Sequence, residues 1–228
     1  TAIITGAAVI NALKVAGKKI EDVKIVINGA GAAGISIGKY LLDLGAKNVI
    51  WCDRKGVIVE GQEGINAAQA ELPKISNPNK VTGLLSDALV DADIFIGVSA
   101  PNIVSKDMIR SMADKAIVFP LANPVPEISH DDAIEAGAYI VGTGSSKYPN
   151  QINNVLVFPG IFRGALDAGA KDINREMMIA ASKAIAESIP EDKLSPENII
   201  PLAFDESVHK KVAEKVAEAA RASGVARK

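Results

Sequence analysis

The chain has few of the residues that most often carry nucleophilic, metal-binding or cross-linking chemistry. Its 228 residues include one cysteine and two histidines. A single cysteine excludes an internal disulfide, and Cys52 stands inside an apolar segment, which favours a buried structural thiol over a nucleophile. His130 follows Ser129 at the predicted start of a helix, which favours a cap region over a proton-transfer role. His209 falls on the polar face of the last predicted helix, so neither histidine indicates a catalytic centre.

The chain also lacks a charge excess and a long apolar run. Its 25 basic and 27 acidic residues give a formal net charge of −2, and dispersed lysines and arginines argue against nucleic-acid binding. No apolar run is long enough to cross a bilayer, and residues 1–17 carry neither a charged leader nor a cleavage pattern. These absences predict a cytoplasmic protein without a membrane partner. A hydrophobic content of 48% allows a substantial core, and the length suits one α/β domain.

A glycine motif follows the first predicted strand. Residues 24–34, KIVINGAGAAG, run a β-branched apolar strand into Gly29-x-Gly31-x-x-Gly34, and an apolar helical pattern follows. Gly29 allows a tight turn, Gly31 lets a pyrophosphate approach the backbone, and Gly34 lets the helix lie close to the strand. The free N–H groups at the helix start would face the phosphates. The residues expected to contact a dinucleotide here are Gly29, Ala30, Gly31, Ala32, Ala33 and Gly34.

The next predicted strand, 48–53, ends in Asp53, about twenty residues past the glycines, where such domains bind the adenosine ribose. The competing interpretation is a solvated strand end. Arg54 and Lys55 follow directly and could pair with a 2′-phosphate, whereas Asp53 would repel one. We therefore expect NAD as the cofactor, bound by Asp53 and Arg54, with NADP as the alternative.

Short apolar strands and helices alternate along the rest of the chain. Strands are predicted from residue 24 and over 48–53, 94–98, 116–122 and 139–141, and helices over 1–16, 84–90, 106–112 and 131–136. Residues 56–80 are predicted to be surface connection, and helices follow from residue 162, the last over 206–222. This alternation predicts an α/β, Rossmann-like, doubly wound and mostly parallel sheet. We expect one domain, 1–228, with an amphipathic leading helix in 1–20, a core of 21–160 and C-terminal helices in 161–228.

Polar residues follow three of the strands and should meet in one crevice at their carboxyl ends. Val98, Ser99 and Ala100, at the end of one strand and directly after it, are expected to contact the cofactor, and the small residues Gly97 and Ser99 leave room for a ribose and a nicotinamide. Asn123 follows the next strand, and because Pro124 holds it extended, its amide can point into the cleft. A plain Asn-Pro turn remains open. An amide-rich segment, 150–154, offers donors and acceptors for a carboxylate or hydroxyl, with loop filler as its alternative.

Several of these motifs, in this order, resemble one family. The glycine turn, WCDRKG (51–56), FIGVSAP (95–101), FPLANPVPE (119–127) and YPNQINNVLVFPGIFRGALD (148–167) are similar to the NAD(P)-binding domain of bacterial malic enzyme. The similarity covers essentially the whole chain. It implies that Asn123 and Asn154 contact the substrate. It also implies that an N-terminal domain, absent from a chain that starts at Thr1, supplies the catalytic tyrosine and lysine, and that Mg²⁺ or Mn²⁺ sits between the domains.

The resemblance implies that the full-length enzyme oxidises malate by hydride transfer to NAD(P) and then decarboxylates the product to pyruvate and CO2. It also implies that this chain alone is inactive, with no catalytic residue and no metal ligand of its own. Two alternatives remain: an oxaloacetate decarboxylase of the same family and a non-catalytic nucleotide-sensing domain. A further alternative, an amino-acid dehydrogenase, has less support, because nothing in the chain resembles the lysine-bearing substrate domain of such enzymes.

Ser145 and Lys147 stand where the family commonly has Arg and Asp, which alters the charge near the substrate loop. The apolar helix over 1–16 and the C-terminal helices also make a homodimer our expectation.

Overall fold

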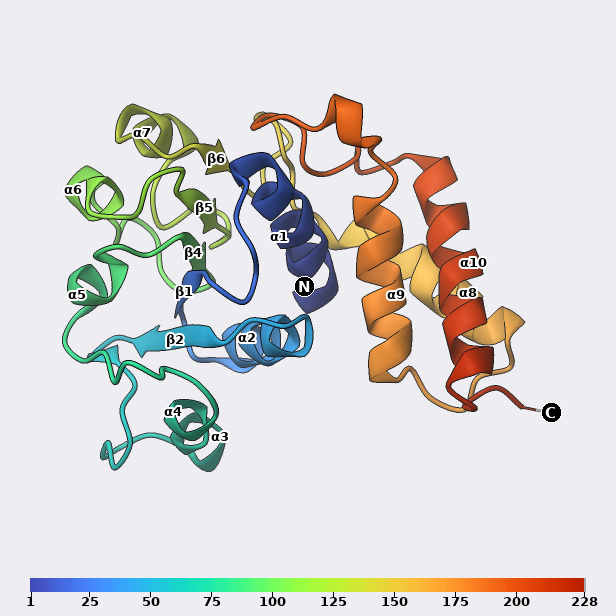
Figure 1. The fold of residues 1–228 in the computed structure, drawn as a ribbon, viewed down its shortest axis with the longest axis horizontal. Coiled ribbons are helices and arrows are strands. Elements are labelled where there is room, and N and C mark those ends of the chain that lie inside the picture. Colours follow the sequence, from blue (N-terminus) through green and yellow to red (C-terminus); the bar gives the residue numbers. More distant parts are fainter. Residues whose placement is uncertain (228) are drawn as a thin grey trace.

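The computed structural model describes residues 1–227, and its centre is a six-stranded sheet in the order β3-β2-β1-β4-β5-β6 (Figure 1). The strands are β1 (Lys24–Asn28), β2 (Asn48–Asp53), β3 (Gly56–Val57), β4 (Ile94–Gly97), β5 (Ile117–Pro120) and β6 (Ile140–Val141). Neighbouring strands pair in parallel except β3, which runs antiparallel to β2. The sheet continues in opposite directions from β1, toward β2 and toward β4, which makes this boundary the topological switch point. The predicted mostly parallel α/β sheet is confirmed.

The central strands are buried on both faces, as their apolar sequences require. In β1, Ile25 and Ile27 join one hydrophobic core, whereas Val26 joins the other. Phe95 of β4 belongs to the same core as Val26. Cys52 is also buried in that core, and burial raises the pKa of its thiol to about 12, which confirms a structural rather than a nucleophilic cysteine.

Helices cover both faces of the sheet (Figure 1). One face carries α5 (Leu85–Leu89), α6 (Lys106–Arg110) and α7 (His130–Glu135), and the other carries α1 (Ala2–Ala16) and α2 (Ala32–Asp43). An outer layer of α8 (Phe158–Asp167), α9 (Arg175–Ala186) and α10 (Glu206–Ala222) packs beyond α1. The remaining helices are the short α3 (Ala67–Ala70) and α4 (Leu72–Ile75) and the 3₁₀ helices η1 (Asn154–Leu156) and η2 (Glu191–Lys193).

The prediction that the leading helix is amphipathic is wrong. α1 lies between α2 and α9, and its residues are buried almost all round. Two of its polar side chains, Asn11 and Thr5, face inward: Asn11 donates hydrogen bonds to the carbonyl oxygens of Ala186 (2.9 Å) and Ile199 (3.0 Å). Thr5 is fully buried as well. The apolar surface of α1 is therefore covered within the chain and does not support the expected self-association.

A second difference concerns residues 56–80, predicted as surface connection. They contain β3, α3 and α4, and the side-chain amide of Gln69 in α3 donates a hydrogen bond of 2.9 Å to the carbonyl oxygen of Ala30 in the glycine turn. Asn66 and Gln69 form a capping box at the start of α3. The segment therefore supports the glycine turn. Other elements differ only at their ends: β2 and α10 match the predicted ranges, whereas α8 begins earlier, at Phe158.

A buried hydroxyl pair joins the C-terminal helices to the sheet domain. The hydroxyl of Tyr40, on α2, lies 2.6 Å from that of Ser182 on α9 and donates to the carbonyl oxygen of Met178 at 2.9 Å. Ser182 in turn donates to the carbonyl oxygen of Ile3 in α1 at 2.6 Å. Burial raises the pKa of Tyr40 to about 12. One contact set thus fixes α1, α2 and α9 relative to each other.

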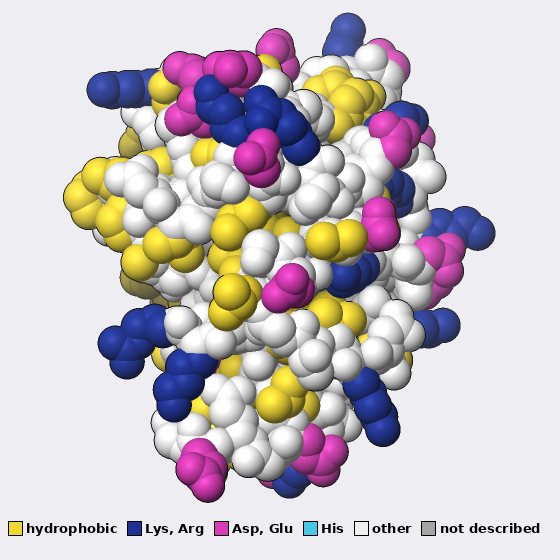
Figure 2. Space-filling view, turned by 90° about the vertical axis from the view of Figure 1, so that its left-hand side faces the viewer, with side chains coloured by type: hydrophobic (Ala, Val, Ile, Leu, Met, Phe, Trp, Pro, Cys, Tyr) yellow, Lys and Arg dark blue, Asp and Glu magenta, His cyan; other side chains and the backbone are white. Residues whose placement is uncertain are grey.

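The described surface mixes both charges. On the face that carries α5, α6 and α7, lysine and arginine side chains lie among aspartates and glutamates (Figure 2). Within residues 1–227, none of the helices combines the length and the apolar character that a membrane span needs.

Candidate functional site

The β1–α2 turn requires glycine at two positions for steric reasons. Gly29 has φ +113°, and a Cβ atom there would collide with the carbonyl group of Val98 after β4. A Cβ atom on Gly34 would overlap the carbonyl oxygen of Gly29, so the first turn of α2 lies directly against the turn that precedes it. At Gly31, by contrast, an added Cβ would meet no atom within 4 Å. Space beside Gly31 is therefore open.

The N-terminus of α2 faces that space without a protein cap. Its N-cap residue, Gly31, makes no side-chain cap hydrogen bond, and residues 31–33 are exposed. The first N–H groups of a helix lack partners within the helix and carry partial positive charge. An exposed, uncapped helix start beside a glycine without steric neighbours is suited to a phosphate group.

Tight packing behind the turn fixes the direction of α2. A Cβ atom on Gly38 would collide with the indole ring of Trp51 in β2, and the indole N–H donates to the carbonyl oxygen of Gly34 at 2.9 Å. Gly38 therefore adds a second close contact of α2, with β2, to the one that Gly34 makes with the turn.

Asp53 lies at the end of β2, half-buried, with its carboxylate held in place. Oδ1 accepts a hydrogen bond from the backbone N–H of Lys55 at 2.7 Å, and Oδ2 accepts one from the side chain of Gln62 at 3.3 Å. The end of β2 adjoins the glycine turn, because the N–H of Gly29 donates to the carbonyl oxygen of Cys52 at 2.9 Å. We call residues 29–34 together with Asp53 the glycine end of the site.

The ends of β4 and β5 lie beside the glycine end. Val98 contacts the position of Gly29, and the hydroxyl of Ser99 accepts a hydrogen bond of 2.7 Å from the side chain of Asn28. Ser99 also contacts Glu127, a fully buried carboxylate that the sequence analysis did not select. The sequence held one signal for a buried carboxylate at this position. Glu127 is the one acidic residue within 117–128, a segment that is otherwise apolar apart from Asn123.

A cavity of about 780 Å³ lies beyond the carboxyl ends of β5 and β6. Its lining includes Asn123 after β5, Asn154 at the start of η1, and Lys147 in the intervening loop. Asn123 and Asn154 are both exposed, so their amides are accessible from this cavity, and Asn154 makes one long hydrogen bond, 3.4 Å, to the hydroxyl of Thr1. We call Asn123, Asn154 and this cavity the amide end.

Two other asparagines of the predicted amide segment have structural roles. Asn150 is buried with φ +58°; its side chain donates to the carbonyl oxygens of Val141 and Pro196 and accepts from the N–H of Ile199. Asn153 accepts a hydrogen bond from the N–H of Val155 as the N-cap of η1. Within 150–154, Asn154 therefore has the amide best placed for a ligand, and loop structure explains Asn150 and Asn153.

His130 lies in the wall of the same cavity. Its ring stacks on that of Tyr148, with centroids 4.3 Å apart and planes 13° apart, and its Nδ1 lies 3.1 Å from Asp131. Ser129 caps α7, as predicted, by accepting a hydrogen bond from the N–H of Asp132. His130 therefore belongs to the cap region, but it also holds the loop that carries Lys147 against α7.

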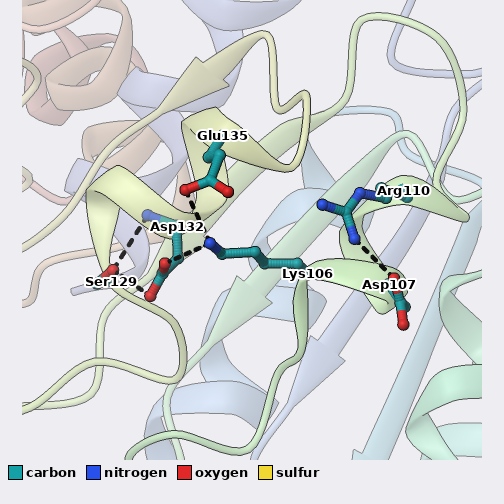
Figure 3. Close-up of polar contacts among 6 residues, drawn as sticks. All are labelled: Lys106, Asp107, Arg110, Ser129, Asp132 and Glu135. Carbon is teal, nitrogen blue, oxygen red and sulfur yellow. Dashed lines mark hydrogen bonds and ion pairs between the residues drawn. The ribbon is translucent and has the colours of Figure 1, made fainter.

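Other acidic groups nearby already have partners. On α7, the carboxylates of Asp132 and Glu135 lie 2.9 and 2.8 Å from Nζ of Lys106, and Arg110 pairs with Asp107 (Figure 3). Hydrogen bonds from Lys106 and Ser129 lower the pKa of Asp132. Within residues 1–227, no group of three or more histidine, cysteine, aspartate or glutamate side chains is arranged to hold a metal ion.

The glycine turn, the uncapped helix start and the carboxylate after β2, all beside a switch point, define a dinucleotide-binding domain of the Rossmann class. A family model described as "Malic enzyme, NAD binding domain" matches residues 1–221, and the chain belongs to that family.

Curated relatives and solved structures agree with this assignment. The chain is 53% identical over its whole length to the bifunctional malic/malolactic enzyme of Bacillus subtilis and 44% identical to the NADP-dependent malic enzyme of Escherichia coli. It covers 56% and 32% of those proteins, so it spans about half or less of their length. The structure of NAD-dependent malic enzyme from Thermotoga maritima matches 95% of the chain, with a TM-score of 0.91 and 49% identity, and the chain covers 57% of it.

Proposed function

We propose that this chain is the cofactor-binding half of an enzyme that oxidises malate with NAD and decarboxylates the product to pyruvate and CO2. The observation that carries the proposal is that the glycine end and the amide end both lie at the carboxyl ends of parallel strands of one sheet. NAD would supply the hydride acceptor, and the residues of this chain would bind and orient cofactor and substrate.

Each predicted residue then has a separate task. Backbone N–H groups at the start of α2 bind the pyrophosphate beside Gly31, and Asp53, held by Lys55 and Gln62, accepts hydrogen bonds from the adenosine ribose. The backbone of residues 98–100 lies along the nicotinamide half.

The amides of Asn123 and Asn154 hold the oxygens of malate and fix its hydroxyl-bearing carbon near the nicotinamide. Orientation of this kind raises turnover without any proton transfer by this chain. The acid, the base and a Mg²⁺ or Mn²⁺ site would come from the part of the full-length enzyme outside this chain, which spans 56% of the Bacillus subtilis relative.

We propose NAD rather than NADP as the preferred cofactor, because the Asp53 carboxylate would repel a 2′-phosphate at the ribose. Exposed Arg54, beside it, keeps NADP binding measurable. Both cofactors appear in the names of the relatives, which include an NAD-dependent malic enzyme of Geobacillus stearothermophilus and the NADP-dependent enzyme of E. coli.

We also propose a cytoplasmic homodimer. Three apolar side chains on one stripe of α8 support it: Phe158, Phe162 and Leu166 are 65%, 46% and 76% exposed. Sedimentation of the full-length protein tests the dimer.

The function is tested in the full-length protein by following malate oxidation through the absorbance of the reduced cofactor and by measuring pyruvate. We expect malate to be consumed only with a nicotinamide cofactor. Decarboxylation of oxaloacetate without NAD as the main activity would favour the oxaloacetate decarboxylase. Nucleotide binding without turnover would favour a sensing domain.

The substrate role of Asn154 is tested in the same assay. Asn154→Ala removes an exposed amide from the cavity, so kcat should fall at least about tenfold while NAD affinity stays unchanged. Asn79→Ala, an exposed asparagine between α4 and α5, is the matched control. Unchanged kinetics of Asn154→Ala would remove this residue from the proposed site.

A further inference from the structure

Glu127 is a fully buried carboxylate whose partners lie in two different loops. Its Oε1 accepts hydrogen bonds from the backbone N–H and the hydroxyl of Ser99, at 2.8 and 3.1 Å, and its Oε2 accepts one from the N–H of Ala122 at 3.0 Å. A carboxylate in a protein interior is stable only when donors satisfy its oxygens. These contacts fix the spacing between the residues that follow β4 and those that follow β5.

The hydrogen bonds extend from Glu127 to a third strand. The hydroxyl of Ser99 accepts from the side chain of Asn28, the last residue of β1. Because β1, β4 and β5 are neighbours in the sheet, one polar chain spans the carboxyl ends of three adjacent strands. The backbone oxygen of Glu127 also accepts from the N–H of Val104, which binds the loop after β4 a second time.

Gly97 provides the space that this carboxylate occupies. A Cβ atom at Gly97, the last residue of β4, would collide with the carboxyl group of Glu127. The side chain of Glu127 therefore lies directly against the carboxyl end of β4, between the sheet and the residues expected to meet the nicotinamide.

We propose that Glu127 is a positioning residue for the nicotinamide half of the cofactor and for Asn123. The proposal rests on the function proposed above. In a Rossmann-type sheet the strands on the far side of the switch point, here β4 and β5, serve the second mononucleotide. Glu127 acts on that half through Ser99 and through Ala122, the residue before Asn123.

The adenosine half has its own supports. Gly34 packs on Gly29, and Asp53 is held by Lys55 and Gln62. Loss of the Glu127 contacts should therefore weaken the binding of NAD but not that of ADP, which contains the adenosine half and the pyrophosphate without the second ribose and the nicotinamide. A residue that only stabilised the fold would affect both ligands equally.

The test compares NAD and ADP in the full-length protein by titration calorimetry. Glu127→Gln keeps the shape but turns one acceptor into a donor that opposes a backbone N–H. We expect NAD affinity to fall about tenfold or more, ADP affinity to stay within about twofold, and kcat for malate to fall. Glu135→Gln, the same change at a 67% exposed side chain on α7, should alter neither ligand.

Ser99→Ala gives an independent test if Glu127→Gln does not fold. It removes only a hydroxyl on an exposed residue and leaves the backbone N–H bond to Glu127 intact, so the same NAD-selective loss should appear, but smaller. Equal losses for both ligands, or unchanged NAD binding and kcat, would overturn the proposal. A wild-type protein that neither binds NAD nor oxidises malate would instead refute the proposed function.

Discussion

The glycine turn, residues 29–34, presents backbone, whereas the amide end presents side chains that loops and a buried carboxylate hold. In that turn, Gly29 and Gly34 are required because any Cβ would collide with backbone, and the groups proposed to bind the pyrophosphate are the N–H groups at the uncapped start of α2. At the amide end, Asn123 and Asn154 are exposed side chains from two separate loops. Steric rules thus define the first end locally, and long-range contacts define the second.

The largest effect should come from breaking the glycine end. Gly34→Ala would place a methyl group on the carbonyl oxygen of Gly29, so the turn and the start of α2 must separate. We expect the free energy of unfolding, measured by urea denaturation, to fall by about 3 kcal/mol. NAD binding should be lost with it. A variant as stable as the wild type would show that α2 can shift without cost.

Gly31→Ala is the matched control for that prediction. Its methyl group would meet no protein atom within 4 Å, and φ is −86°, so the free energy of unfolding should stay within about 0.5 kcal/mol of wild type. NAD affinity, however, should still fall about tenfold or more, because the methyl group would occupy the space proposed for the pyrophosphate. Normal NAD binding by Gly31→Ala would place the pyrophosphate elsewhere.

The same contrast explains which features the sequence predicted. Strand 48–53 and helix 206–222 were predicted with their observed bounds, because apolar runs and charged helical spacing are local signals. The burial of α1 was not predicted, because a polar residue such as Asn11 normally indicates the solvent-facing side of a helix. Only its hydrogen bonds to Ala186 and Ile199, which are distant in sequence, show that the Asn11 side chain points inward. Glu127 was missed for the same reason, since its donors lie at Ser99, distant in sequence, and at a backbone N–H.

An intermediate effect is expected where the glycine end meets the ribose. Asp53→Asn keeps the shape of the side chain and removes the charge that would repel a 2′-phosphate. The ratio of the NADP to the NAD dissociation constant should fall about tenfold, and added salt should oppose the gain because Arg54 is exposed. Asp107→Asn, the same change on α6, is the control. An unchanged ratio would show that Asp53 does not set cofactor choice.

The smallest effect on cofactor binding at neutral pH should come from a change at Tyr40, which anchors α2 outside both the glycine end and the amide end of the site. Tyr40→Phe removes the hydrogen bond to Met178 and the contact with Ser182, so the free energy of unfolding should fall by about 1 kcal/mol. NAD affinity should not change, because Gly29 and Gly34 set the turn geometry locally. Weaker NAD binding by this variant would show that the glycine end also depends on long-range contacts.

The pH dependence of the same variant separates hydrogen bonding from burial. The pKa of Tyr40 is raised to about 12 in the folded protein, against about 10 for an unfolded tyrosine. Its contribution to stability is therefore complete below pH ~10 and declines as the pH rises toward ~12, by up to about 3 kcal/mol, because the unfolded chain ionises first. Tyr40→Phe cannot ionise, and Cys52, whose pKa is also raised, is present in both proteins. The difference in the free energy of unfolding between the two proteins, measured by urea denaturation, should thus close above pH ~10 and then reverse, because the loss of up to about 3 kcal/mol exceeds the advantage of about 1 kcal/mol at neutral pH. A constant difference would contradict the burial of the Tyr40 hydroxyl.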